Sequence, residues 1–295
     1  MSTAAVDPVA VAVAPRRRRT RRRITSLILP VFTVGMILYL ASPVFLMILY
    51  GFNDLEGERQ TAKFTCCTLN WWRNWLAFPD LNEALRVSLS VAIPAAVIAT
   101  ILGALIGLVL GRYSFTGRAW VNFVIFLAIA VPEIVLGSSL LSMFVLVNSE
   151  RPLGLLVNIG YPTILMSHIG FSIAFVAITV RARVQGLDRS LENAAQDLFA
   201  TPLVAFFRVT LPLIAPGVIA GFLLAFVLSL DDFVITSFVR GQTNTFPTWV
   251  YGATRIGVPP QVNVWGTLLF SAGLLAAGTN LVLARRSTRR ATPGA

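Results

Sequence analysis

Three carboxylates inside apolar stretches are the residues of this chain whose type and spacing suggest chemistry. Glu133, Asp231 and Asp232 each fall within a long hydrophobic segment. A charged side chain at the centre of a lipid bilayer costs about 2.5–3.5 kcal/mol on insertion scales, so such residues usually face a cavity or a partner. Carboxylates spaced along a path can replace part of the hydration shell of an extended polycation. The sequence therefore predicts a cationic substrate, with stabilisation of helix packing or of a re-entrant kink as the alternative.

The two adjacent aspartates are expected to do different jobs. Helical periodicity places Ser229, Asp232 and Thr236 on one stripe, at positions i, i+3 and i+7. Asp231 instead shares its face with apolar residues. We therefore predict that Asp232 faces the solute path, whereas Asp231 pairs at a subunit contact or a helix break.

Aromatic residues near the outer end offer a second kind of contact. Trp249 and Tyr251 precede Gly257 and Pro260 in the last outer loop. Their rings could line a gate by contacting ammonium groups, and anchoring at the membrane interface is an equally good explanation. The single histidine, His168, fits a packing hydrogen bond better than a proton relay.

The elements that must position these side chains are membrane-spanning helices. Hydrophobic residues make up 56% of the chain and charged residues 13%, with a mean hydropathy of +0.76, whereas soluble domains carry about a quarter charged residues. A span needs about 20 mostly apolar residues. Six stretches qualify: Ile24–Tyr50, Ala84–Leu110, Ala119–Val147, Pro162–Val180, Leu211–Phe238 and Val264–Ala284. We expect an all-α integral membrane protein with six transmembrane helices over residues 24–284, between basic tails 1–23 and 285–295, the first of them disordered.

The basic residues set the expected orientation. Most of the 24 Lys and Arg residues fall in the two tails and in the loops that share their side of the membrane, and cytoplasmic segments carry such an excess. Both termini are therefore predicted to be cytoplasmic. The net charge of +11 is explained by arginines at membrane ends, where anionic lipid attracts them, so nucleic acid is not expected as a partner.

A short polar helix is predicted between the fourth and fifth stretches, at about residues 190–202. Ser190 can cap its start, Glu192 lies in the first turn, and Pro202 stops it. At 1.5 Å per residue it would be about 16 Å long. Helices that lie on the inner leaflet prefer Lys and Arg on their polar face, but this one carries Glu192 and Asp197. A groove on another protein is therefore the better explanation for it.

This polar helix resembles a known motif. The matching pattern is Glu192-x-Ala194-Ala195, Asp197-Leu198, Ala200-Thr201-Pro202, Phe206 or Phe207, Val209 and Leu211-Pro212-x-x-x-Pro216. It is similar to the EAA loop of binding-protein-dependent ABC transporter permeases. The resemblance implies a type I ABC importer permease fold in which the loop docks into a cleft of a cytoplasmic ATPase. The implied coupling residues are Glu192, Ala194, Ala195, Asp197, Leu198, Phe199, Ala200 and Pro202. Phe199 stands where the family usually has a glycine, and it adds bulk at a tight turn.

Within the family, the chain most resembles the spermidine/putrescine permeases. The supporting segments are Gly51-Phe52-Asn53, Trp71-Trp72, Val131-Pro132-Glu133, Ser167–Phe171, Leu228–Phe238 and Gly257-Val258-x-Pro260-x-Val262-Asn263. The resemblance implies a polyamine path that combines the candidates above: Asp232, Glu133, Asp231, Ser229, Thr236, Trp249 and Tyr251. It also implies three kinds of protein partner: a dimer of ATPase subunits, a second homologous permease and an extracytoplasmic solute-binding protein.

No catalytic site is expected on this chain. The Walker A pattern is absent, so ATP would bind to the partner subunit and no cofactor is expected here. No nucleophile–base or metal constellation lies at a common depth, which argues against a membrane enzyme and a metal site. The alternatives are a permease for an opine or amino-acid derivative, and a proton-coupled secondary transporter, which would keep working after deletion of the ATPase.

Overall fold

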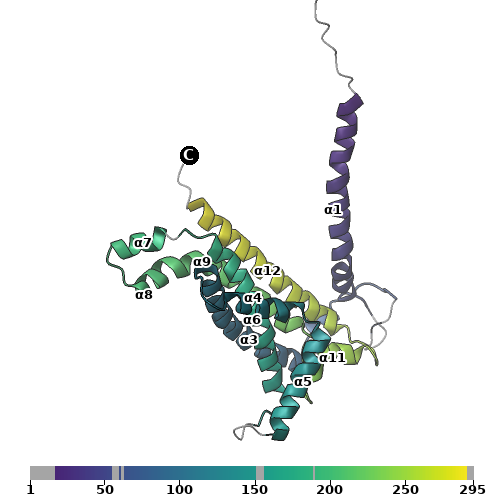
Figure 1. The fold of residues 1–295 in the computed structure, drawn as a ribbon. Coiled ribbons are helices and arrows are strands. Elements are labelled where there is room, and N and C mark those ends of the chain that lie inside the picture. Colours follow the sequence, from purple (N-terminus) through teal and green to yellow (C-terminus); the bar gives the residue numbers. More distant parts are fainter. Residues whose placement is uncertain (1–16, 55–59, 61–62, 151–155, 189, 291–295) are drawn as a thin grey trace, which may run out of the picture. The chain divides into compact units, whose positions relative to one another are not determined.

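The computed structural model describes residues 17–54, 60, 63–150, 156–188 and 190–290 (Figure 1). These residues form helices and loops. The helices are α1 (Arg17–Tyr50), α2 (Asn70–Arg73), α3 (Pro79–Arg112), α4 (Arg118–Ala130), α5 (Glu133–Glu150), α6 (Tyr161–Gln185), α7 (Ser190–Asp197), α8 (Pro202–Ala205), a π-helical turn η2 (Phe206–Thr210), α9 (Leu211–Asp231), α10 (Val234–Val239), α11 (Phe246–Ala253) and α12 (Gln261–Arg290).

The chain divides into two units, residues 1–50 and residues 51–295. The first contains α1, which begins at Arg17, inside the stretch that was predicted to be a disordered tail. The second ends with α12, which continues to Arg290 and so enters the predicted second tail. Arginine is a good helix former, which allows helices to extend beyond their apolar part. The rest of the predicted tails, residues 1–16 and 291–295, lies outside the described residues.

Five helical segments among the described residues are long and apolar enough to cross a membrane: 28–50, 79–112, 133–150, 161–185 and 202–231. The third predicted stretch, Ala119–Val147, is not one helix, because it is interrupted at Val131-Pro132 between α4 and α5. Proline lacks an N–H group and disfavours helical backbone at the residue before it. The fifth predicted stretch, Leu211–Phe238, is interrupted between Asp231 and Val234. The sixth predicted stretch, Val264–Ala284, overlaps a shorter apolar helix at 261–276.

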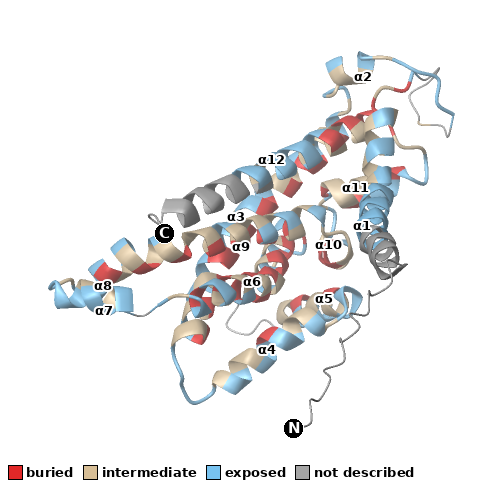
Figure 2. Ribbon diagram, turned by 90° about the horizontal axis from the view of Figure 1, so that it is seen from above, coloured by how far each residue is buried: buried red, intermediate tan, exposed pale blue. Residues whose placement is uncertain are grey.

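The core of the second unit is built from α3, α6 and α9, which carry many of the buried residues (Figure 2). Glycines allow these helices to approach closely. A Cβ atom on Gly107 of α3 would lie 2.6 Å from the carbonyl oxygen of Ala177 in α6, and one on Gly221 of α9 would lie 3.0 Å from the side chain of Val176. Small residues at such contacts let dispersion forces hold helices together where lipid removes the hydrophobic drive.

The close approach at Gly107 gives a direct test of this core. We expect Gly107→Ala to lower stability by about 1–3 kcal/mol, because the added methyl group must push two helix backbones apart. The unfolding temperature of the protein in detergent would report this loss. Gly170→Ala is the matched control, because a Cβ atom at Gly170 meets nothing within 4 Å. Equal behaviour of the two variants would contradict the packing described here.

Candidate functional site

A cavity of about 290 Å³ is lined by residues from both interruptions, the one between α4 and α5 and the one between α9 and α10. Its acidic wall consists of Glu133, Asp231 and Asp232, and its aromatic wall consists of Phe171, Phe175 and Phe233. The remaining lining residues are aliphatic: Ala128, Ile129, Val131, Leu136, Leu228, Val234 and Ile235. The cavity thus offers carboxylates beside apolar and aromatic surface, a combination suited to an organic cation.

The break between α9 and α10 is stabilised by the side chain of Asp232. Its carboxylate accepts hydrogen bonds from the backbone N–H groups of Ile235, at 3.3 Å, and Thr236, at 2.8 Å. These amides belong to the first turn of α10, where a helix leaves N–H groups without internal partners and favours negative charge. The hydroxyl group of Thr236 donates to the same carboxylate at 2.7 Å. The carboxylate therefore replaces hydrogen bonds that a continuous helix would have made.

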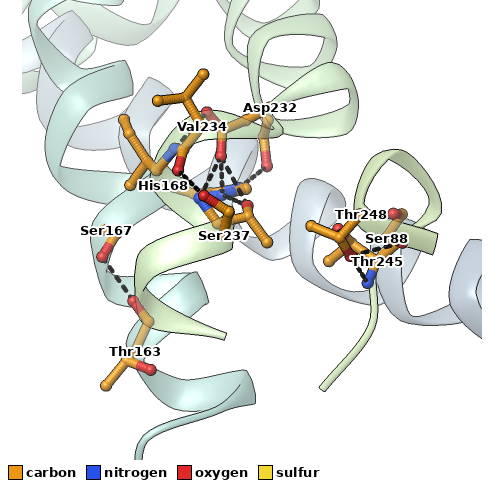
Figure 3. A network of polar contacts seen from close by, with 12 residues as sticks. Ser88, Thr163, Ser167, His168, Asp232, Val234, Ser237, Thr245 and Thr248 are labelled. Carbon is orange, nitrogen blue, oxygen red and sulfur yellow. Dashed lines mark hydrogen bonds and ion pairs between the residues drawn. The ribbon is translucent and has the colours of Figure 1, made fainter. Parts of the chain in front are cut away.

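His168 of α6 joins the two sides of this break (Figure 3). Its Nδ1 atom lies 2.7 Å from the Ser229 hydroxyl in α9, and its Nε2 atom lies 2.9 Å from the Thr236 hydroxyl in α10. The same Nε2 atom is 3.3 Å from Asp232, and the two side chains are only 1% and 6% exposed. One buried imidazole thus connects three helices, in agreement with the packing role predicted for it.

The predicted stripe of Ser229, Asp232 and Thr236 does come together, but it gathers around His168 rather than around open space. Asp232 touches the cavity while its carboxylate is engaged in the break. Asp231 is exposed at the cavity wall, as is Glu133 in the first turn of α5. The periodicity argument assumed an uninterrupted helix, and the break changes which aspartate is accessible. Nothing in the local sequence pointed to His168 as the partner of this break.

The two predicted gate residues lie on α11. The Tyr251 ring is 4.6 Å from the ring of Phe233, which lines the cavity, and the Arg255 guanidinium lies 5.6 Å from the Tyr251 ring centre. Trp249 is half-buried on the same helix. The Ser88 hydroxyl of α3 accepts a hydrogen bond from the backbone N–H of Phe246 at 2.8 Å, which fixes the start of α11. Tyr251 is therefore connected to the cavity through Phe233.

The predicted polar helix is shorter than expected. The helix was expected over about residues 190–202, but α7 ends at Asp197. We refer to the whole stretch 190–202 as the coupling segment. The Ser190 N–H donates to the Asp188 carboxylate at 2.9 Å, and this bond holds the pKa of Asp188 below its ordinary value. Asp188, rather than Ser190 as predicted, thus supplies the acceptor at the start of α7. Pro202 does not stop this helix, because it begins α8, where its missing N–H does no harm.

The stop signal of α7 is a left-handed residue, Phe199, with φ of +64°. Its N–H donates to the carbonyl of Gln196 at 2.9 Å, and the N–H of Ala200 donates to the carbonyl of Ala195 at 3.0 Å. This pair of bonds is the Schellman motif, in which the left-handed position is usually glycine. The turn expected for a glycine is therefore formed here with a phenylalanine.

Glu192 connects the coupling segment to the transmembrane helices. Its carboxylate pairs with Arg112 at the end of α3 and accepts a hydrogen bond from the Thr210 hydroxyl just before α9. The Glu192 side chain is 20% exposed and that of Arg112 is 11% exposed. Ala195 and Ala200 are half-buried, whereas Ala194, Asp197, Leu198, Phe199 and Pro202 are exposed. Of the predicted coupling residues, the exposed ones are accessible to a partner.

Comparison with known proteins gives one consistent family. The family model described as binding-protein-dependent transport system inner membrane component matches residues 103–285. The putrescine transport system permease protein PotI of Escherichia coli (strain K12) is 36% identical over 85% of this chain and 89% of its own length. The spermidine/putrescine transport system permease protein PotC of the same strain is 32% identical over 88% of this chain and 94% of its own length.

Solved structures show the same fold. A chain from the crystal structure of a bacterial ABC transporter involved in the import of the acidic polysaccharide alginate superposes with a TM-score of 0.66 at 16% identity. The match covers 94% of this chain and 99% of the other. The complex of the bacterial alginate ABC transporter with a pentasaccharide-bound periplasmic protein gives 0.62 at 16% identity, covering 95% of this chain and 99% of the other. At this identity the likeness establishes the fold alone.

The anchoring role of Glu192 is open to test. We expect Glu192→Ala to increase hydrogen exchange across residues 190–200 about tenfold or more, because Arg112 and Thr210 lose a half-buried partner worth about 1–3 kcal/mol. The control is Asp197→Ala, which removes an exposed carboxylate from the same helix. If both variants exchange alike, α7 is not held by Glu192.

The hydrogen-bond network at the helix break makes a second prediction. His168→Leu leaves the Ser229 and Thr236 hydroxyls and the Asp232 carboxylate without their common partner, so we expect a loss of about 2–4 kcal/mol. The unfolding temperature in detergent measures it. Ser172→Ala on the same helix is the control, since the buried Ser172 hydroxyl has no hydrogen-bond partner among the described residues. A loss from Ser172→Ala as large as that from His168→Leu would contradict the network's importance.

Proposed function

This chain belongs to the family of binding-protein-dependent transport system inner membrane components, and from that premise we propose that its cavity conducts a polyamine such as putrescine or spermidine. As a family member it is the multi-pass permease subunit of an ATP-driven ABC importer in the inner membrane, and ATP hydrolysis resides in a separate chain. The proposal concerns the solute and the residues that contact it.

The observation that carries the proposal is the pairing of exposed carboxylates with aromatic rings in one cavity. Asp231 and Glu133 line the same cavity, so a cation bound there would offset the repulsion between two carboxylates. A polyamine alternates ammonium groups with methylene chains. Its ammonium groups suit the carboxylates, and its methylene groups suit Phe171, Phe175 and Phe233, whose faces also attract cations.

The predicted path residues take different roles in this proposal. Asp231 and Glu133 contact the solute directly, whereas Asp232, Ser229 and Thr236 hold the wall that presents Asp231. Tyr251 and Trp249 line a gate at the outer end of the solute path, where the Tyr251 ring lies beside that of Phe233. The names of PotI and PotC, which specify putrescine and spermidine, support the same class of solute.

A permease for an opine or an amino-acid derivative is the second candidate. The fold does not decide between them, because a structure of the same fold belongs to a transporter of an acidic polysaccharide. The three acidic residues of the cavity favour a solute without carboxylates, since like charges in a site of low dielectric repel strongly. A proton-coupled secondary carrier is disfavoured by the family, although interrupted helices also occur in such carriers.

The assembly implied by the family has further parts. A binding-protein-dependent importer has ATPase subunits, a solute-binding protein and paired permease subunits. We propose that two ATPase subunits act with this chain and one homologous permease, and that the coupling segment faces the cytoplasm. The proposed topology retains six spans over residues 24–284, with both termini cytoplasmic. Closure of the ATPases on ATP would displace α7, and Glu192 would transmit the displacement to α3 and α9.

Uptake by proteoliposomes that contain the complete importer tests the solute. We expect Asp231→Asn and Glu133→Gln each to lower the rate of putrescine or spermidine uptake about tenfold, because each removes one carboxylate that replaces the hydration of an ammonium group. Glu83→Gln is the control: it removes an exposed carboxylate that pairs with Arg86 outside the cavity. Unchanged uptake in both cavity variants would reject the proposed path. Uptake of an opine in place of polyamines would favour the second candidate.

A further inference from the structure

We propose that Phe199 is an anchor side chain that the coupling segment presents to the ATPase subunit, in an apolar pocket with a basic rim. The proposal rests on the permease function above, because it requires an ATPase partner. Phe199 does not line the cavity, and its proposed role does not depend on which solute is transported.

The backbone at Phe199 is strained in a way that the turn itself does not need. Its φ of +64° lies in the left-handed region, where the Cβ atom of an L-residue crowds the backbone and glycine does not. The two hydrogen bonds that close the turn come from the backbone N–H groups of Phe199 and Ala200, which any residue other than proline supplies. Glycine or asparagine would form the same turn at lower cost.

The phenyl ring gains nothing from the chain itself to offset this strain. Phe199 is 95% exposed, and its neighbour Leu198 is 81% exposed. The apolar contact that commonly accompanies such a turn is made between the residues at either end of its longer hydrogen bond, here Ala195 and Ala200, and does not require the residue in the left-handed position. A strained and exposed aromatic residue is therefore unfavourable in the isolated chain, which indicates that its contact lies in a partner.

The charge of α7, the helix that this turn ends, favours a protein partner over lipid. The eight residues of α7 include Glu192 and Asp197 and contain no Lys or Arg. Helices that bind the membrane surface carry basic residues on their polar face, because the inner leaflet is anionic. Asp197 is exposed two positions before Phe199, so a pocket that accepts the ring would be complemented by basic groups at its edge.

The turn also fixes the direction in which the Cα–Cβ bond of Phe199 leaves the backbone before binding. On one side, two hydrogen bonds close the turn on α7. On the other, Pro202 begins α8, and its ring restricts φ. Aromatic residues that are held rigidly at the centre of an interface contribute a large share of the binding energy, since little freedom is lost on association. The backbone of Phe199 is held in this way by the turn.

The experiment uses the complete importer, purified through a tag on this chain. Three variants are compared: Phe199→Gly, Phe199→Asn and Phe199→Tyr. The measurements are the rate at which ATPase subunits dissociate after dilution and the ATPase activity of the assembly without solute. We expect dissociation about tenfold faster for the glycine and asparagine variants, a tenfold change being equivalent to about 1.4 kcal/mol. The tyrosine variant, which keeps the ring, should stay within about twofold of the original chain.

Unfolding temperatures in detergent separate loss of the anchor from damage to the turn. Both glycine and asparagine accept the left-handed conformation, so the Phe199→Gly and Phe199→Asn variants should unfold at the temperature of the original chain or above it. Retention of the ATPase by Phe199→Gly as tightly as by the original chain would overturn the proposal, as would a tyrosine variant that dissociates as fast as the glycine variant. These measurements require no solute, so an importer that assembles normally but does not transport polyamines contradicts the proposed function alone.

Discussion

Inside a lipid bilayer a helix cannot simply end, because its terminal N–H and C=O groups find no water to replace their lost partners. The break between α9 and α10 is possible because Asp232 accepts two N–H groups of α10 and is itself held by Thr236 and His168. This satisfied break is the feature on which the cavity depends. If the helix were uninterrupted, the Asp231 and Asp232 side chains would point in other directions. The acidic wall of the cavity would then not form as it does here.

The two adjacent aspartates have different roles: the carboxylate of Asp232 stabilises the break, and the break leaves the carboxylate of Asp231 accessible from the cavity. The Asp232 side chain is bound by groups from α6 and α10 and is almost fully buried. Asp231 precedes it at the end of α9 and is exposed toward the cavity, opposite the interruption at which Glu133 begins α5. Proline explains the interruption before Glu133. The interruption at Asp232 depends instead on a side-chain network, so it is tied to the packing of α6.

The apolar lengths in the sequence predicted the helices and the polar segment between α6 and α9, because both follow from local composition. The break at Asp232 could not be predicted in the same way. It contains no proline or glycine, and its partner His168 lies 61 positions before Ser229. The conformation of Phe199 is likewise opposed to its local preference. Val131-Pro132 did carry a local signal, but the length of the apolar stretch around it favoured one continuous span.

A mechanical connection between the coupling segment and the cavity follows from where α9 begins and ends. Glu192 reaches Thr210 immediately before α9, and α9 runs through 21 residues to Asp231, a length of about 31 Å at 1.5 Å per residue. The helix packs against α6 through Gly217 and Gly221, which leave little room for sideways movement. In the proposed mechanism, a displacement applied at Glu192 would pass along α9 more readily than across it. It would arrive at the break, where hydrogen bonds between side chains, rather than a continuous helix, connect α9 to α10.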